Sequence, residues 1–145
     1  PRTQPQLKSI ARMAGLAAST TVPPATSPEE LLRMRRLLDT IYLDDKVKGY
    51  IVDLVFATRE PDQVGLAKLK PLILYGASPR ASLALARTAR ARAFMEGRGF
   101  VTPQDVKAVG SMVLRHRVLT TYEAEAEGVD SEELLRTIFD TVPVP

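Results

Sequence analysis

The sequence predicts an all-α protein, a helical bundle of four to five main helices joined by short extended connectors. In several segments apolar residues recur at i, i+3, i+4 and i+7, which is the spacing of one buried helix face. Ser-Pro or Thr-Pro pairs precede three of these segments, and a hydroxyl residue followed by proline is typical of a helix start. No segment alternates apolar and polar residues as a half-buried strand does.

The composition is ordinary for a globular domain. The chain has 145 residues, of which 45% are hydrophobic and 26% charged, with a net charge of +3. It has no apolar run long enough to span a membrane. Because it has no cysteine and only one histidine, His116, disulfides and thiolate sites are excluded, and a histidine-rich metal site or a Ser-His pair is not expected. We expect a cytoplasmic location.

The first 26 residues are expected to be a connector. Residues 4–14 carry apolar side chains at helical spacing and predict a short helix, whereas residues 17–26 contain Pro23-Pro24, which cannot continue one. Since the chain begins with proline, we expect a part of a longer protein. The predicted organisation is a connector over residues 1–26 and a helical domain over residues 27–145.

Two helices are predicted next. Ser27 and Glu30 have the spacing of a capping box, and the helix they open runs to about Asp39. After an extended piece over residues 41–43, a helix beginning at Asp44 or Asp45 ends near residue 59. One face of this second helix carries Val47, Tyr50, Ile51, Leu54 and Val55.

The longest predicted helix runs from Pro79 to about Glu96. It follows a loop over residues 60–72 and an extended approach over residues 73–75. Its apolar residues lie on two sides: Leu83, Ala86, Ala93 and Phe94 on one, and Leu85 and Ala89 on the other. This distribution predicts a central helix packed between neighbours.

Two further helices complete the bundle. Thr102 and Asp105 flank Pro103 and predict a capped helix with Val106, Val109, Gly110, Val113 and Leu114 on one face. Residues 118–129 are expected to be irregular and acidic. Asp130 caps the last helix, which carries Leu134, Leu135, Ile138 and Phe139, and residues 142–145 are expected to be non-helical.

The central stretch of the sequence is Gly76-Ala77-Ser78-Pro79-Arg80-Ala81, at the start of the longest helix. We expect Ser78 to cap this helix and Pro79 to fill its first position, while the small residues before them admit something close to the backbone. Arg80 would then present its guanidinium to a phosphate or carboxylate. The alternative is an ordinary helix cap with a solvated arginine. Arg87, about two turns later, is either a second such group or a surface arginine.

The sequence lacks the motifs of a complete enzyme. It has no Gly-rich phosphate loop ending in Lys-Ser or Lys-Thr, no His-Glu-x-x-His and no Gly-x-Ser-x-Gly. Its acidic pairs, Glu29-Glu30, Asp44-Asp45 and Glu132-Glu133, all lie at predicted helix starts, where capping explains them. Any part in catalysis would consist of lending a charged group to a site on another domain.

Several stretches of the sequence resemble the same protein family. Residues 75–81 resemble the sensor-2 motif of MoxR-type AAA+ ATPases. Further stretches resemble the C-terminal lid domain of that family in the same order, at residues 27–32, 47–60, 100–106, 113–117 and 142–145. The resemblance covers about residues 27–145, and it implies an all-helical lid over ATP bound to an α/β core.

The resemblance also implies roles for individual residues and partners. Arg80 would be the catalytic sensor-2 arginine that reaches the γ-phosphate, with Ser78 and Pro79 at the same nucleotide contact, and Tyr42 or Tyr75 would lie near the adenine or in the core. ATP and Mg²⁺ would be bound mainly by a core domain absent from this chain, so the chain alone should neither hydrolyse ATP nor bind it tightly. The full-length protein would form a ring, commonly a hexamer. It would act as a chaperone-like factor on von Willebrand factor A domain proteins or other clients.

An alternative function comes from the residues alone. Arg87, Arg90 and Arg92 lie in the most basic region of the chain and would give an independent helical module a face for nucleic acid. Aromatic residues are few and no stacking motif is present, which favours a solvated basic face instead.

Overall fold

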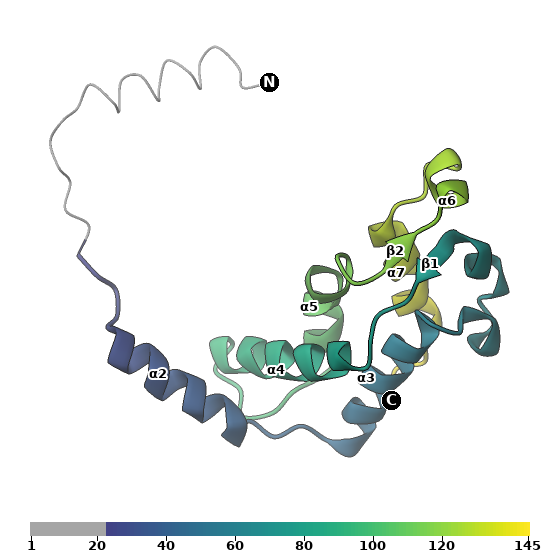
Figure 1. Cartoon of the computed structure of the whole chain (residues 1–145). Helices are drawn as coiled ribbons and strands as arrows, with labels where there is room; N and C mark the ends of the chain where they lie inside the picture. The colour runs from purple at the N-terminus through teal and green to yellow at the C-terminus, as the bar shows by residue number, and fades with distance from the viewer. Residues whose placement is uncertain (1–22) are drawn as a thin grey trace, which may run out of the picture. The chain divides into compact units, whose positions relative to one another are not determined.

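The computed structural model describes residues 23–145 and confirms the all-α class (Figure 1). The α-helices are α2 (Pro28–Leu37), α3 (Asp45–Ala57), α4 (Arg80–Met95), α5 (Pro103–Leu114), α6 (Tyr122–Ala126) and α7 (Ser131–Thr141). Between them lie the 3₁₀ helices η1 (Leu38–Thr40), η2 (Pro61–Val64) and η3 (Ala67–Leu72), and the strands β1 (Ile73–Tyr75) and β2 (Leu119–Thr120). None of the helices within residues 23–145 is long and apolar enough to cross a membrane. The predicted helix over residues 4–14 lies outside the described residues.

The chain divides into two compact units, Pro1–Leu31 and Leu32–Pro145, so the border falls within α2. At the start of α2 the Glu30 N–H donates to the Ser27 hydroxyl oxygen (3.2 Å), as the sequence predicts. The Glu30 carboxylate accepts from the Thr26 hydroxyl (2.8 Å) rather than completing the capping box. No residue of α2 is buried.

The buried faces of α3, α5 and α7 are those that the apolar spacing predicts. They consist of Val47, Tyr50, Ile51, Leu54 and Val55 on α3, Val106, Val109, Gly110, Val113 and Leu114 on α5, and Leu134, Leu135, Ile138 and Phe139 on α7. The predicted caps are also present. The Asp44 side chain accepts from the Lys46 N–H and the Asp130 side chain from the Glu133 N–H, both at 2.8 Å.

The central helix α4 packs against both α3 and α5, as the sequence predicts. Its buried residues form a single stripe at intervals of four: Ala81, Leu85, Ala89 and Ala93. Among the residues predicted on its two packed sides, Leu85, Ala89 and Ala93 are buried, and Ala86 and Phe94 are partly buried against the core. Leu83, at 66% exposed, is the exception. The reason is that alanine at three of the four stripe positions lets neighbouring helices approach closely, whereas the larger Leu83 lies outside the stripe.

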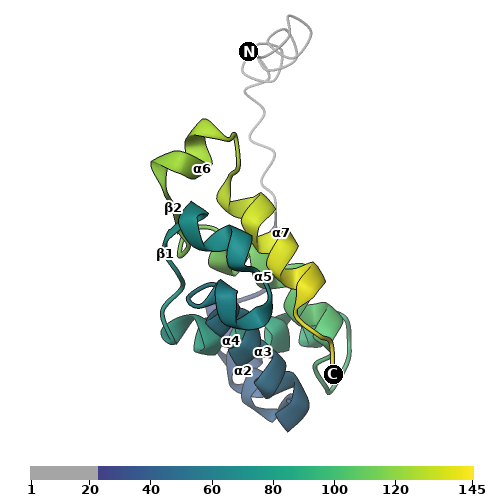
Figure 2. The ribbon, with the colours of Figure 1, turned by 90° about the vertical axis from the view of Figure 1, so that its right-hand side faces the viewer.

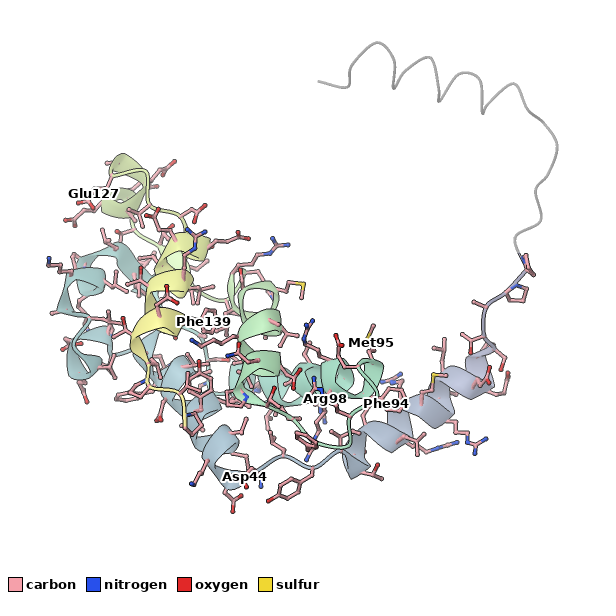
Figure 3. The ribbon with its side chains drawn as sticks, turned by 180° about the vertical axis from the view of Figure 1, so that it is seen from behind. Asp44, Phe94, Met95, Arg98, Glu127 and Phe139 are labelled. Atoms are coloured by element: carbon pink, nitrogen blue, oxygen red, sulfur yellow. The ribbon has the colours of Figure 1, made fainter. Side chains whose placement is uncertain are left out.

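Helix α7 lies beside α5 (Figure 2). Phe139, labelled in Figure 3, projects from α7 toward Gly110 of α5. A Cβ built on Gly110 would lie 2.8 Å from the Cε1 atom of the Phe139 ring, closer than ordinary van der Waals contact allows. Gly110 therefore gives the aromatic ring its space between the two helices.

Two segments expected to be irregular contain regular structure. Residues 60–72 form η2 and η3 rather than an open loop, and residues 118–129 contain β2 and α6. Strand β1 pairs antiparallel with β2, with Ile73 opposite Thr120 and Tyr75 opposite Leu119. This pairing joins residues more than forty positions apart, and local sequence gives no signal for it.

Candidate functional site

The backbone before α4 is held against the end of α3 by Thr58. This residue is fully buried, and its hydroxyl donates to the Val55 carbonyl (2.7 Å) and accepts from the Ala77 N–H (2.9 Å). The Arg59 guanidinium donates to the Ala77 carbonyl at 3.4 Å. Because a buried backbone group without a partner costs free energy, these bonds fix the chain three residues before Arg80.

Gly76 lies directly against the backbone at the end of α3. A Cβ at this position would lie 2.6 Å from the carbonyl carbon of Thr58 and 2.8 Å from the Cα of Arg59. The sequence predicts that small residues here admit a close neighbour, and that neighbour is the backbone at the end of α3. Only glycine fits without moving that backbone.

The predicted cap of α4 is wrong in detail. Helix α4 begins at Arg80 with Pro79 as its N-cap, and no side chain caps it. In the predicted cap, the Ser78 hydroxyl oxygen would accept a hydrogen bond from the Ala81 N–H. That N–H donates instead to the Ser78 carbonyl (2.8 Å), and the Ser82 N–H donates to the Pro79 carbonyl (3.1 Å). Tight i to i+3 backbone bonds thus close the first turn, and the Ser78 side chain is left exposed.

Arg80 is exposed in the first turn of α4, as the sequence predicts, although it takes the first helical position in place of Pro79. Within residues 23–145 it forms no ion pair. Other arginines of the described chain are neutralised: Arg98 pairs with Asp105 (2.5 Å) and Arg115 with Glu132 (3.0 Å). An exposed guanidinium at the positive end of a sixteen-residue helix can contact an anion without first breaking a salt bridge.

The arginines that the sequence groups together differ in their surroundings. Arg87 and Arg90 line a cleft that does not include Arg80. Arg92 lies elsewhere, with Glu96 at 3.6 Å and Asp105 at 3.6 Å from its guanidinium. Arg92 is thus partly neutralised by acidic side chains, whereas Arg87 and Arg90 form no ion pair within residues 23–145.

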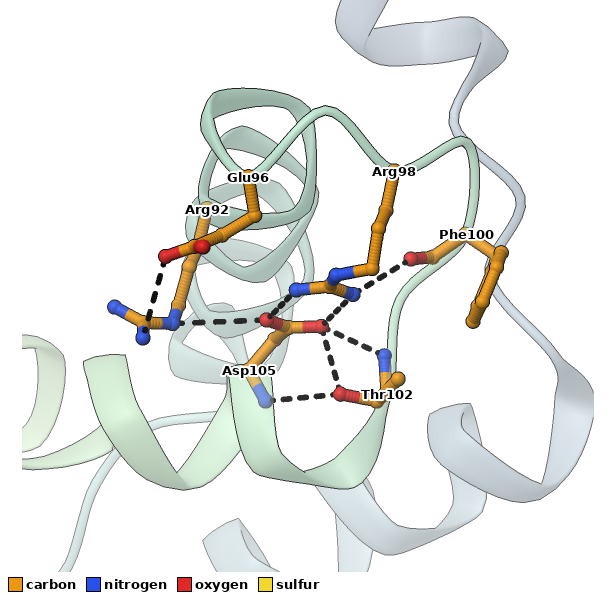
Figure 4. Close-up of polar contacts among 6 residues, drawn as sticks. All are labelled: Arg92, Glu96, Arg98, Phe100, Thr102 and Asp105. Carbon is orange, nitrogen blue, oxygen red and sulfur yellow. Dashed lines mark hydrogen bonds and ion pairs between the residues drawn. The ribbon is translucent and has the colours of Figure 1, made fainter.

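The start of α5 carries a buried charged network (Figure 4). Thr102 and Asp105 form the complete capping box, and Asp105 is 2% exposed. Arg98 donates to both carboxylate oxygens of Asp105, at 2.8 and 2.5 Å. Burial raises the pKa of Asp105, but hydrogen bonds from Arg98 and from the N–H and hydroxyl of Thr102 outweigh it and lower the pKa from 3.8 to about 2. This network ties the end of α4 to the start of α5.

The aromatic residues that the resemblance singles out are both exposed rather than in the core. Tyr42 is 61% exposed and Tyr75 65% exposed. Tyr42 donates to the Asp44 carboxylate (3.1 Å), and this hydrogen bond raises the pKa of the tyrosine. Within residues 23–145 no three acidic or histidine side chains gather where they could hold a metal ion. The exposed Arg80 guanidinium has the donor geometry to bind a phosphate or a carboxylate.

Sequence reasoning missed Thr58 and Arg59 as the residues that position this site. Thr58 and Ala77 are 19 residues apart, and helical periodicity carries no information about such a contact. The one available signal is that residues 57–60 belong to a stretch with family resemblance.

Comparison with known proteins agrees with this architecture. The family profile described as an AAA lid domain matches residues 68–138. The chain is 40% identical over 119 residues to Chaperone MoxR1 of Mycobacterium tuberculosis, covering 82% of this chain and 32% of that protein. Protein MoxR of Paracoccus denitrificans is 41% identical over 105 residues, covering 68% and 31%. A candidate ATPase from Cytophaga hutchinsonii matches in crystal structure with a TM-score of 0.89 and 35% identity, over 99% of this chain and 44% of that chain.

A helical bundle with this profile match is a lid domain of the AAA type. The chain belongs to the MoxR family of AAA+ ATPases, of which it is a lid domain. It spans about a third of the length of the named relatives it matches.

Proposed function

We propose that this lid domain contributes Arg80 as a sensor-2 arginine to ATP binding and hydrolysis by the full-length protein. The observation that carries the proposal is the placement of Arg80: it is exposed and unpaired within residues 23–145, on a backbone that Thr58 anchors to α3. A positive charge carried by a fixed backbone can stabilise a transferring phosphoryl group, because the backbone does not have to rearrange before the reaction. Ser78 and Pro79, exposed beside it, would form part of the same contact.

In this proposal the Mg²⁺ ion and the phosphate cradle belong to the ATPase core, and the lid supplies one guanidinium and a covering surface. Residues 1–26 would connect that core to the lid over residues 27–145. The chain alone would neither hydrolyse ATP nor bind it tightly, because one arginine does not replace the phosphate cradle and the metal ligands.

We further propose that the full-length protein is a cytoplasmic, chaperone-like ring, commonly a hexamer, that acts on von Willebrand factor A domain proteins or other clients. Support comes from the relative named Chaperone MoxR1 and from the family membership of the chain. Neither nucleic acid nor a membrane is a partner in this proposal.

The test is steady-state ATP hydrolysis by the full-length protein with Arg80→Ala. We expect the rate to fall by roughly 10-fold or more, equivalent to ~1.4 kcal/mol or more in the barrier, because a transition-state contact is lost. Arg136→Ala, which removes an exposed arginine of α7, is the matched control and should leave the rate unchanged. Circular dichroism checks that both variants fold. An unchanged rate in Arg80→Ala would show that Arg80 is only a solvated surface arginine.

A further inference from the structure

A second concentration of positive charge lies in a cleft between the α2–η1 segment and α4. The cleft has a volume of about 480 Å³. Four arginines line it: Arg35 and Arg36 from α2, and Arg87 and Arg90 from α4. Leu32 and Leu38 give it an apolar wall, and Asp39 is the one acidic side chain in its lining.

The single carboxylate of Asp39 leaves an excess of positive charge among these four arginines. Within residues 23–145 none of them forms an ion pair, in contrast to Arg92, Arg98 and Arg115. The Nε atom of Arg90 is buried, and no group within residues 23–145 forms a hydrogen bond with it. The first 22 residues contain no Asp or Glu, so they offer no carboxylate side chain either. Like charges gathered in one cleft repel each other, and a bound anion would relieve that repulsion.

We propose that this cleft binds a compact polyphosphate anion, such as a triphosphate chain. The planar guanidinium donates two parallel N–H groups to a phosphate, and several guanidiniums around one cavity match several adjacent phosphates. The volume of the cleft lies in the range of small-ligand sites. The site goes beyond the proposed role of Arg80, which does not line the cleft and lies seven residues, or roughly 10 Å of helix, before Arg87.

The distribution of charge favours a compact anion over a nucleic acid. A nucleic-acid backbone is bound along a track of cations, with many phosphates neutralised at once. Here Arg92 and Arg98, which follow Arg90 along α4 and its exit, are paired with Glu96 and Asp105, so the positive charge of the cleft does not continue as a track in that direction. The unpaired guanidiniums thus form a pocket rather than a stripe.

The test is calorimetric titration of the 145-residue chain with inorganic tripolyphosphate at two salt concentrations. We expect binding that weakens with salt, and a dissociation constant raised by roughly 10-fold or more in the double variant Arg87→Ala/Arg90→Ala. Arg35→Ala/Arg36→Ala should have the same effect, and this second pair keeps the test valid if loss of the partly buried Arg90 impairs folding. The matched control, Lys68→Ala/Arg136→Ala, removes the same charge from exposed positions outside the cleft and should change affinity by less than about twofold.

Two ligands distinguish the sources of the polyphosphate. If ATP binds with the affinity of tripolyphosphate, the phosphate chain alone is recognised. If ATP binds more tightly, and Leu32→Ser/Leu38→Ser removes the difference, the ligand is a nucleoside polyphosphate. The proposal is overturned if tripolyphosphate does not bind at low salt, or if the control pair weakens binding as much as the cleft pairs do. It is equally overturned if a poly-glutamate peptide binds the cleft more tightly than tripolyphosphate, which would make the cleft a protein-docking site.

Discussion

The starts of α4 and α5 share a sequence pattern and differ in what holds them. A hydroxyl residue followed by a proline stands at each start, Ser78-Pro79 and Thr102-Pro103, but α5 begins at its proline and α4 one residue after its proline. At α5 the Thr102 hydroxyl accepts a hydrogen bond from the Asp105 N–H, and the Asp105 carboxylate accepts one from the Thr102 N–H. At α4 no side chain caps the helix, and the preceding backbone is held by Thr58 of another element.

The difference follows from the residue three positions after the hydroxyl residue. Asp105 at that position in α5 accepts from the N–H and hydroxyl of Thr102 and binds Arg98, so the start of α5 is self-contained and its charges are balanced. The corresponding residue of α4 is Ala81, which offers no such group and is buried in the core. The arginine beside Ala81 therefore stays unpaired, and the start of α4 is the one suited to an external anion.

The largest effect is expected where α4 depends on α3. Gly76→Ala should lower the free energy of unfolding by about 3 kcal/mol, because the new methyl group meets backbone atoms of Thr58 and Arg59 that cannot turn aside. Urea denaturation measures the change. Gly49→Ala is the control: Gly49 lies in α3 with nothing within 4 Å, so alanine there should stabilise by roughly 0.5–1 kcal/mol. Equal stability of Gly76→Ala and the parent would mean that the end of α3 is not what holds α4.

A smaller effect is expected from the network at α5. Asp105→Asn should lower the free energy of unfolding at pH 7 by about 2 kcal/mol, since Arg98 loses a bidentate carboxylate partner. Urea denaturation again measures the change, with the exposed Asp140→Asn as a control that should alter stability little. If Asp105→Asn left the free energy of unfolding unchanged, the charged network would not be what stabilises the start of α5.

The same carboxylate gives the network a defined pH dependence. The folded pKa of about 2 lies below the unfolded value of 3.8, so Asp105 stabilises the fold above pH 3.8 and this contribution is lost as pH falls toward 2. By linkage it amounts to about 2 kcal/mol. The stability difference between the parent and Asp105→Asn should therefore shrink between pH 4 and pH 2 in denaturation curves. A difference that stays constant over this window would show that the carboxylate charge is not responsible.

The smallest effects compare the two hydroxyl residues directly. Thr102→Ala should destabilise by about 1 kcal/mol, because the cap of α5 is lost, whereas Ser78→Ala should change stability by less than about 0.5 kcal/mol. Thermal denaturation of the two variants side by side checks this. If the two costs were equal, Ser78 would have to cap α4 in solution.

The sequence by itself determined the local features of this protein. Caps such as Thr102 and Asp130, and the apolar faces of α3, α5 and α7, act within a few turns of one helix, so spacing along the chain is enough to predict them. The exposure of Arg80 at the first turn of α4 follows from the same local pattern.

The tertiary structure alone decided which residues meet across the chain. Thr58 forms a hydrogen bond with Ala77, and Gly76 lies against the backbone at the end of α3. Strand β1 pairs with β2, and Arg35 and Arg36 line the same cleft as Arg87 and Arg90. It also decided that α4 buries the stripe from Ala81 to Ala93 and leaves Leu83 exposed. These contacts depend on how whole helices pack against each other. Packing is set by the combined shape of side chains that lie far apart in the sequence, so it cannot be predicted from the periodicity of one helix.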